Sequence, residues 1–147
     1  MKKSIFVLAL FALILSASAD NIKNSVVGIG GYDPVSYHLA KRPQRGTGNF
    51  AVMHAGVNYL FASEKNMNLF KENPEKYLPA YGGYCAFGVA VGKKFISDPE
   101  VWDIIDGRLY LNLDNRIKGM WVKDISGFIK KADANWQKIK DLKPEKL

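Results

Sequence analysis

Large apolar side chains recur at alternate positions along residues 49–62, and two short runs rich in apolar residues flank a turn within residues 101–112, which predicts two β-hairpins. The first spans residues 49–62 and turns near Ala55-Gly56. The second spans residues 101–112 and turns at Asp106-Gly107, a dipeptide that strongly favours a tight hairpin turn. Two paired hairpins of this kind indicate a domain that contains β-sheet and has one face of each strand packed inward.

The register of the first hairpin decides the role of His54. With a two-residue turn, His54 shares a face with the apolar side chains of both strands. A three-residue turn with Gly56 left-handed competes, because Ala55 disfavours the positive φ that the tighter turn requires. The three-residue turn would shift the strand register by one residue and move His54 into the turn. The sequence leaves both registers open.

Three helices are predicted by capping residues and by spacing. Asp33-Pro34 indicates a short helix over residues 35–41, and Ser63 indicates one over residues 64–73 that Pro74 ends. A longer helix begins at Asp124, and its apolar positions recur at helical spacing. These positions are Ile125, Phe128, Ile129, Ala132, Trp136 and Ile139.

The predicted fold class is therefore α+β: a compact single domain with two β-hairpins, several short helices and a C-terminal amphipathic helix. Residues 82–92 are ambiguous, because three glycines weaken a helical stripe there. No internal repeat is evident in the sequence.

The first nineteen residues have the pattern of a secretory signal peptide. Lys2 and Lys3 precede an apolar run over residues 5–15, which is too short to span a membrane, and Ala17-Ser18-Ala19 fits a cleavage site. We therefore expect residues 1–19 to be removed and residues 20–147 to form the domain. The expected location is exported, either periplasmic or secreted, with no transmembrane segment in the mature chain.

The net charge and the distribution of basic residues limit the kinds of molecule that the protein is expected to bind. The formal net charge of +7 falls to +5 when Lys2 and Lys3 are removed, and the basic residues are mixed with acidic ones. Without a basic face interleaved with aromatic residues, we expect no nucleic acid partner. Weak association with an anionic surface remains compatible with the charge. Nothing in the sequence identifies a protein partner.

Cys85 is the single cysteine, so it has no disulfide partner in its own chain. It is either a buried apolar thiol, a ligand to a soft metal, a redox-active or nucleophilic group, or the partner of a thiol in another molecule. As a metal ligand it suits copper or zinc, with His54 as the companion donor. As a nucleophile it requires a nearby base, and no residue spacing identifies one.

Seven segments, taken in order along the mature chain, resemble the YHS-domain family in its exported, single-domain form. They are residues 31–35, 59–63, 73–77, 81–86, 98–99, 106–112 and 132–136. The resemblance implies a small α+β domain and no defined reaction. In the family's short metal-binding modules the hairpin-to-helix corner carries two cysteines. Ala62 and Asn66 occupy those positions here, and an alanine methyl cannot bind a metal.

These observations favour a non-catalytic role for the chain, as an exported binding module for a transition metal or a small ligand near Cys85. The candidate metal ligands are Cys85 and His54. The candidate ligand-binding residues are Tyr84, beside the flexible Gly82-Gly83 pair, with the carboxylates of Asp33 and Asp98. The alternatives are a structural or protein-interaction domain with an inert buried cysteine, and a thiol-dependent enzyme.

Overall fold

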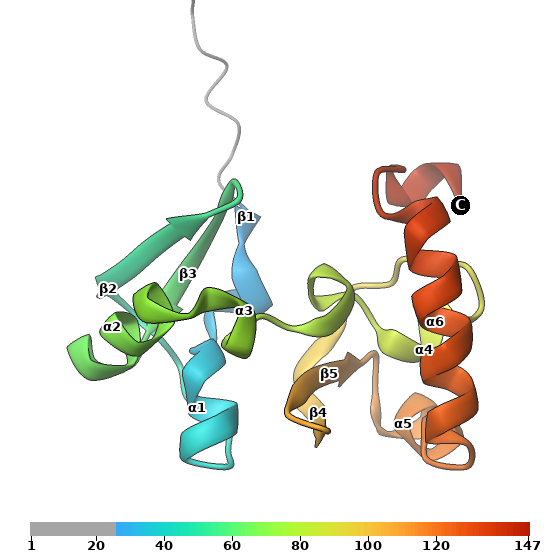
Figure 1. Cartoon of the computed structure of the whole chain (residues 1–147), viewed down its shortest axis with the longest axis horizontal. Helices are drawn as coiled ribbons and strands as arrows, with labels where there is room; N and C mark the ends of the chain where they lie inside the picture. The colour runs from blue at the N-terminus through green and yellow to red at the C-terminus, as the bar shows by residue number, and fades with distance from the viewer. Residues whose placement is uncertain (1–25) are drawn as a thin grey trace, which may run out of the picture.

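The computed structural model describes residues 26–147. The predicted signal peptide, residues 1–19, lies outside this range. The described chain folds as α+β, with a three-stranded sheet, a two-stranded sheet and short helices around two hydrophobic clusters. Figure 1 shows the three-stranded sheet with α1 to α3 on one side of the molecule, and α4 to α6 on the other.

The first half of the chain, residues 26–77, is built on the sheet β1-β3-β2. Strand β1 (Val26–Val27) runs parallel to β3 (Val57–Phe61), which pairs antiparallel with β2 (Thr47–His54). Two helices pack on this sheet, and a third packs on those two helices. They are α1 (Pro34–Leu39), α2 (Glu64–Glu72) and α3 (Pro74–Tyr77), with the 3-10 turn η1 (Gly28–Gly31) before α1.

The second half, residues 78–147, is built on the hairpin of β4 (Asp98–Ile105) and β5 (Arg108–Asn112). Its helices pack on one another and on β5. They are α4 (Ala86–Ala90), α5 (Asn115–Trp121) and α6 (Ile125–Ile139), with the 3-10 turns η2 (Ala80–Gly83) before α4 and η3 (Pro144–Lys146) at the end.

The capping predictions are confirmed at three helices. The side chains of Asp33, Ser63 and Asp124 accept hydrogen bonds from the backbone N–H groups of the first turns of α1, α2 and α6. Both hairpins also form as predicted. The first has the two-residue turn, because His54 pairs with Val57 and Ala55 adopts a φ of 49°. The pairing of β2 with β3 across a two-residue turn therefore imposes the left-handed conformation that Ala55 disfavours.

The two halves repeat one architecture, which corrects the expectation that the chain has no internal repeat. Every Cα pair in the first hairpin has a counterpart 51 positions later in the second, as Thr47–Phe61 and Asp98–Asn112 show. Both hairpins have a register irregularity at the same place, and both turn through two residues of positive φ. The helix caps follow the same offset, with Ser63 matched by Asp114.

The segment before each hairpin repeats as well, with an offset of 52 positions. In η1, Ile29 and Gly30 have left-handed φ/ψ angles of 51°/37° and 56°/25°. In η2, Tyr81 and Gly82 have 55°/36° and 61°/19°. Each turn leads through a tyrosine and a capping residue into a short helix. The molecule is thus two copies of one supersecondary unit, and the second copy extends its last helix into α6.

The hairpin β4-β5 joins the two halves. Alternate residues of β5 belong to different hydrophobic clusters, since Leu109 and Leu111 lie in the cluster of the first half and Tyr110 lies in that of the second. Side chains of adjacent strand residues point to opposite faces, so one strand serves both cores. The Tyr37 hydroxyl also donates to the carbonyl of Pro99 at 2.8 Å across the junction.

Candidate functional site

Cys85 caps helix α4 from inside the core. Its side chain is 1% exposed, and Sγ accepts a hydrogen bond from the Gly88 N–H at 3.4 Å. The thiol in turn donates to Asn112 Oδ1 at 3.7 Å. Burial raises the pKa of the Cys85 thiol, and backbone N–H groups that point at the sulfur oppose this only in part. The sulfur is therefore a protonated, hydrogen-bonded capping group.

The two predicted metal ligands have separate surroundings. His54 packs edge-on against Phe70, with a ring centroid separation of 5.9 Å, and its Nε2 lies 3.7 Å from Glu75 Oε1. The hydrogen-bonding partners of Cys85 come from α4 and β5 instead. Within residues 26–147, no three His, Cys, Asp or Glu side chains are grouped as a metal ion requires. The structure thus gives Cys85 and His54 separate roles in packing.

Asp33 is the counterpart of Cys85 in the first half, and it is fully buried. One carboxylate oxygen accepts from the Val35 N–H at 2.8 Å. The other accepts from the Ala62 N–H at 3.0 Å and from Asn66 Nδ2 at 2.6 Å. Ala62 and Asn66 are the positions at which the resembling metal modules carry cysteines. Here a hydrogen-bonded carboxylate ties that corner together, so Asp33 is structural and does not face a ligand.

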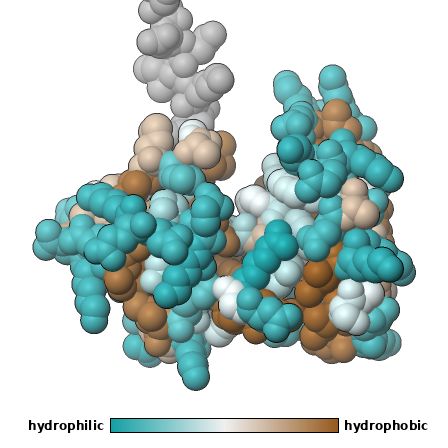
Figure 2. Space-filling model, in the orientation of Figure 1, coloured by the Kyte–Doolittle hydropathy of each residue, from teal (hydrophilic) through white to brown (hydrophobic). Residues whose placement is uncertain are grey.

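A groove of about 850 Å³ separates the two repeated turns. This volume is within the range of small-molecule sites. Each half contributes its left-handed turn and the tyrosine that follows the turn, and the second half also contributes the start of its hairpin. The lining residues of the first half are Val26, Val27, Gly28, Ile29, Gly30, Tyr32, Arg45 and Val57. Those of the second half are Gly82, Gly83, Tyr84, Ile96, Ser97, Asp98, Pro99 and Glu100. Figure 2 shows the surface hollowed between the halves.

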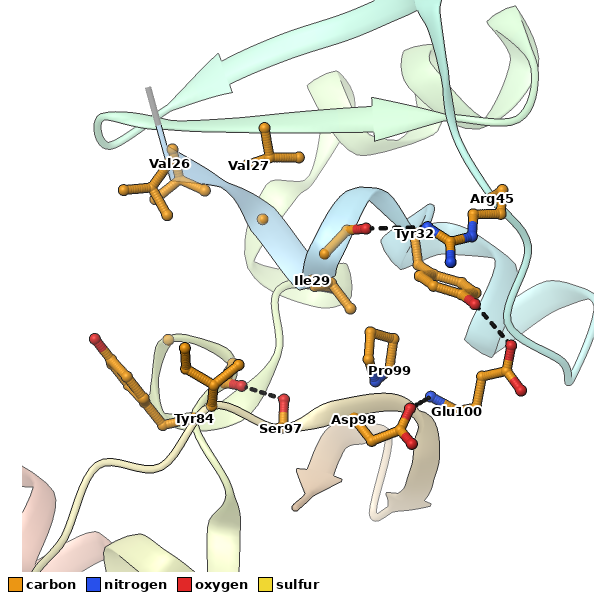
Figure 3. A pocket seen from close by; sticks show the side chains of 16 residues that line it. Val26, Val27, Ile29, Tyr32, Arg45, Tyr84, Ser97, Asp98, Pro99 and Glu100 are labelled. Atoms are coloured by element: carbon orange, nitrogen blue, oxygen red, sulfur yellow. Dashed lines mark hydrogen bonds between the residues drawn. The ribbon is translucent and has the colours of Figure 1, made fainter. Parts of the chain in front are cut away.

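One end of the groove is apolar and open to solvent. Ile96 is 82% exposed, Val26 is 65% exposed and Val27 is 43% exposed. Tyr84 lies at the same end, half-buried beside Ile96, to which its backbone is bridged. Figure 3 shows Val26 and Tyr84 on opposite sides of this end. Large apolar side chains gathered at an open groove are typical of a binding surface.

The other end of the groove is polar, but its charged groups already have partners (Figure 3). The Tyr32 hydroxyl donates to Glu100 Oε1 at 2.7 Å, a bond that is the main reason why the pKa of Tyr32 is raised. The Arg45 guanidinium lies 4.4 Å from the centroid of the Tyr32 ring. Asp98 Oδ1 accepts from the Glu100 N–H at 2.9 Å. These contacts fix the polar end around Tyr32.

Of the predicted ligand-binding residues, the structure therefore brings Tyr84 and Asp98 to one groove and leaves Asp33 in the core. Sequence reasoning missed Tyr32, Arg45 and Glu100. A signal for Tyr32 was present, since Gly30-Gly31-Tyr32 and Gly82-Gly83-Tyr84 are the same tripeptide. No sequence pattern marked Arg45 or Glu100. Glu100 reaches the Tyr32 hydroxyl only when the two halves pack together, and Arg45 lies against the Tyr32 ring through the tertiary fold of its own half.

These features define an α+β protein made of two similar units, with a groove of ligand size at their junction. Residues 46–81, which include the first hairpin, α2 and α3, match the family model of the YHS domain. The resemblance to the YHS-domain family is thus confirmed over that segment. Comparison with curated proteins and with solved structures gives no significant match. No helix in residues 26–147 has the length and hydrophobicity needed to cross a membrane.

Proposed function

We propose that this protein is an exported, non-catalytic binding module that holds an uncharged, mainly apolar small molecule in the groove between its halves. The observation that carries the proposal is the apolar end of the groove, where Val26, Val27 and Ile96 are exposed beside Tyr84. Covering these side chains removes apolar surface from water, at roughly 25 cal/mol per Å².

The polar end supports an uncharged ligand. Glu100 has the Tyr32 hydroxyl as a partner, Asp98 has a backbone N–H, and Arg45 has the Tyr32 ring. A charged ligand would have to compete for these groups and would leave one of them unpaired. A ligand with an apolar body meets no such cost, and a single hydroxyl or carbonyl at its end suits the mixed charges there.

The surroundings of Cys85 argue against the two alternatives that use its thiol. A nucleophilic thiol requires a base within hydrogen-bonding reach and a lowered pKa. Cys85 bonds to Gly88 and Asn112 instead, and burial raises its pKa. A copper or zinc site centred on Cys85 would need further donors, which the described part of the chain does not group around it.

The test uses N-phenyl-1-naphthylamine, an uncharged apolar molecule whose fluorescence rises when it leaves water. We expect saturable binding and a raised melting temperature, because a ligand bound only by the folded state stabilises that state. Ile96→Asp should weaken binding at least tenfold. Val122→Asp is the matched control, since Val122 is 50% exposed and does not line the groove.

Equal binding by both variants would contradict the proposed site. Absence of any saturable binding would favour the alternative that the apolar end contacts a protein partner. The exported location has its own test, which is N-terminal sequencing of the protein recovered from the periplasm or the medium. A mature chain that begins at Asp20 is expected, and an intact Met1 on protein retained in the cytoplasm would refute it.

A further inference from the structure

Two tyrosines line the groove from equivalent positions of the repeat, and each has a cation against its ring. Tyr32 follows η1 and Tyr84 follows η2. Arg45 Cζ lies 4.4 Å from the centroid of the Tyr32 ring, and Lys94 Nζ lies 5.3 Å from that of Tyr84. A cation at this distance is attracted to the ring face and restricts the ring's orientation.

Lys94 is held in place by the C-terminal end of α6. Its side chain is largely buried, and Nζ donates to the carbonyl oxygens of Lys140 and Leu142 at 2.6 Å each. The same ammonium lies 5.3 Å from the ring centroid of Trp136, which in turn lies 6.4 Å from that of Tyr84. Among residues 26–147, Lys94 forms no ion pair with a carboxylate.

We infer that Lys94 is a positioning residue for the ligand, and that it acts by fixing the Tyr84 ring as a wall of the groove. The inference rests on the proposed function of the groove. Lys94 itself does not line the groove, so any effect on the ligand must pass through a residue that does. The end of α6 thereby helps to set the shape of a site to which it contributes no side chain.

Lys94→Met tests this inference, because methionine keeps most of the apolar stem and removes the charge. At a temperature where the variant is fully folded, we expect its affinity for N-phenyl-1-naphthylamine to fall about fivefold, because binding must then immobilise a Tyr84 ring that Lys94 no longer restricts. Lys118→Met is the matched control. Lys118 also donates to a backbone carbonyl, that of Trp102 at 2.6 Å, and pairs with Asp103, but it does not contact the groove.

A double-mutant cycle separates positioning from general destabilisation. If Lys94 acts through Tyr84, Lys94→Met should weaken binding in the wild type and cause no further loss in a Tyr84→Leu background. Additive losses, or equal losses in Lys94→Met and Lys118→Met, would overturn the inference while the proposed function stands.

A second measurement keeps the two proposals distinguishable. If the wild type binds no probe, the proposed function fails, and the Lys94 inference is then judged from the aromatic NMR resonances of Tyr84. We expect Lys94→Met to shift the Tyr84 ring resonances and Lys118→Met to leave them in place. Unchanged Tyr84 resonances in Lys94→Met would rule out a positioning role.

Discussion

Cys85 occupies the same place in the second half of the protein that Asp33 occupies in the first. Each residue follows the tyrosine of a left-handed turn, and each caps the short helix that comes next. Each also accepts hydrogen bonds that would otherwise be left unmade in the core. The position of the single cysteine is thus explained by its role as the N-terminal cap of helix α4.

Replacing Cys85 should show that the sulfur acts as an acceptor. Cys85→Val keeps the size and removes the acceptor, so we expect a loss of about 1–3 kcal/mol in the free energy of unfolding. Cys85→Asp should be more stable than Cys85→Val at pH 7, because a carboxylate there can reproduce the contacts of Asp33. The backbone N–H groups of Phe87, Gly88 and Leu113, which oppose the rise in the pKa of the Cys85 thiol, can donate to that carboxylate.

Urea unfolding of both variants and of the wild type measures these differences. The advantage of Cys85→Asp should disappear on acidification, since only the ionised carboxylate accepts all of these bonds. If Cys85→Val were as stable as the wild type, the hydrogen bond that the sulfur accepts would not contribute to the free energy of unfolding.

The Cys85 thiol should be inert in the native protein. Burial raises its pKa, so little thiolate forms near neutral pH, and the side chain is 1% exposed. We expect alkylation by iodoacetamide at pH 8 to be at least a hundredfold slower in the folded protein than in urea. Mass spectrometry of the modified chain follows the reaction, and rapid labelling of folded protein would restore a thiol-dependent role.

Gly46 should tolerate no side chain. A Cβ added there would clash with the backbone of Leu60, so strand β3 would have to move. We expect Gly46→Ala to lower the free energy of unfolding by about 1–3 kcal/mol, as overpacking does. Gly48→Ala is the control, because nothing lies within 4 Å of an added Cβ there. Chemical unfolding measures the free energy of unfolding of both variants. Equal losses would show that the backbone near Leu60 shifts to accommodate the added methyl group.

His38 should make stability depend on pH. Burial, together with the charge of Lys76, lowers the pKa of His38 below the 6.5 of a free side chain. Below about pH 6.5 the unfolded chain therefore binds more protons than the folded one, so stability falls as the pH falls. His38→Phe keeps a ring against Tyr77 and removes the titrating group.

The expected result is a shallower loss of stability between pH 7.5 and 5.5 in His38→Phe than in the wild type, measured by urea unfolding at each pH. All other titratable groups, His54 included, are the same in both proteins, so the difference between the two curves reports His38. Parallel curves would show that His38 takes up its proton equally well in both states.

Most elements of the fold follow from local sequence. Asp33-Pro34, Ser63 and Asp124 each start a helix for a reason that the adjacent residues supply, and Asp106-Gly107 fixes its hairpin turn. Helix α5 was not predicted, because its apolar positions are few and its capping Asp114 follows a strand without a break in the pattern.

The repeat escaped sequence analysis because backbone geometry, rather than side-chain identity, is what the two halves share. Tyr81 takes the left-handed position of Ile29, and Asp106 takes that of Ala55. The marks in the sequence are short: two Gly-Gly-Tyr segments, two Tyr-Leu pairs at residues 59–60 and 110–111, and the matched glycines of the turns. The groove could not be predicted for the same reason, since it arises between halves whose equivalence was hidden.

Strand β5 places Leu109 and Leu111 in one core and Tyr110 in the other. Unfolding of either half would therefore expose one face of β5 to water and remove packing that stabilises the other half. Two copies of a small motif therefore form one cooperative unit, because separating them would expose the buried Leu109 and Leu111 side chains of β5 to water.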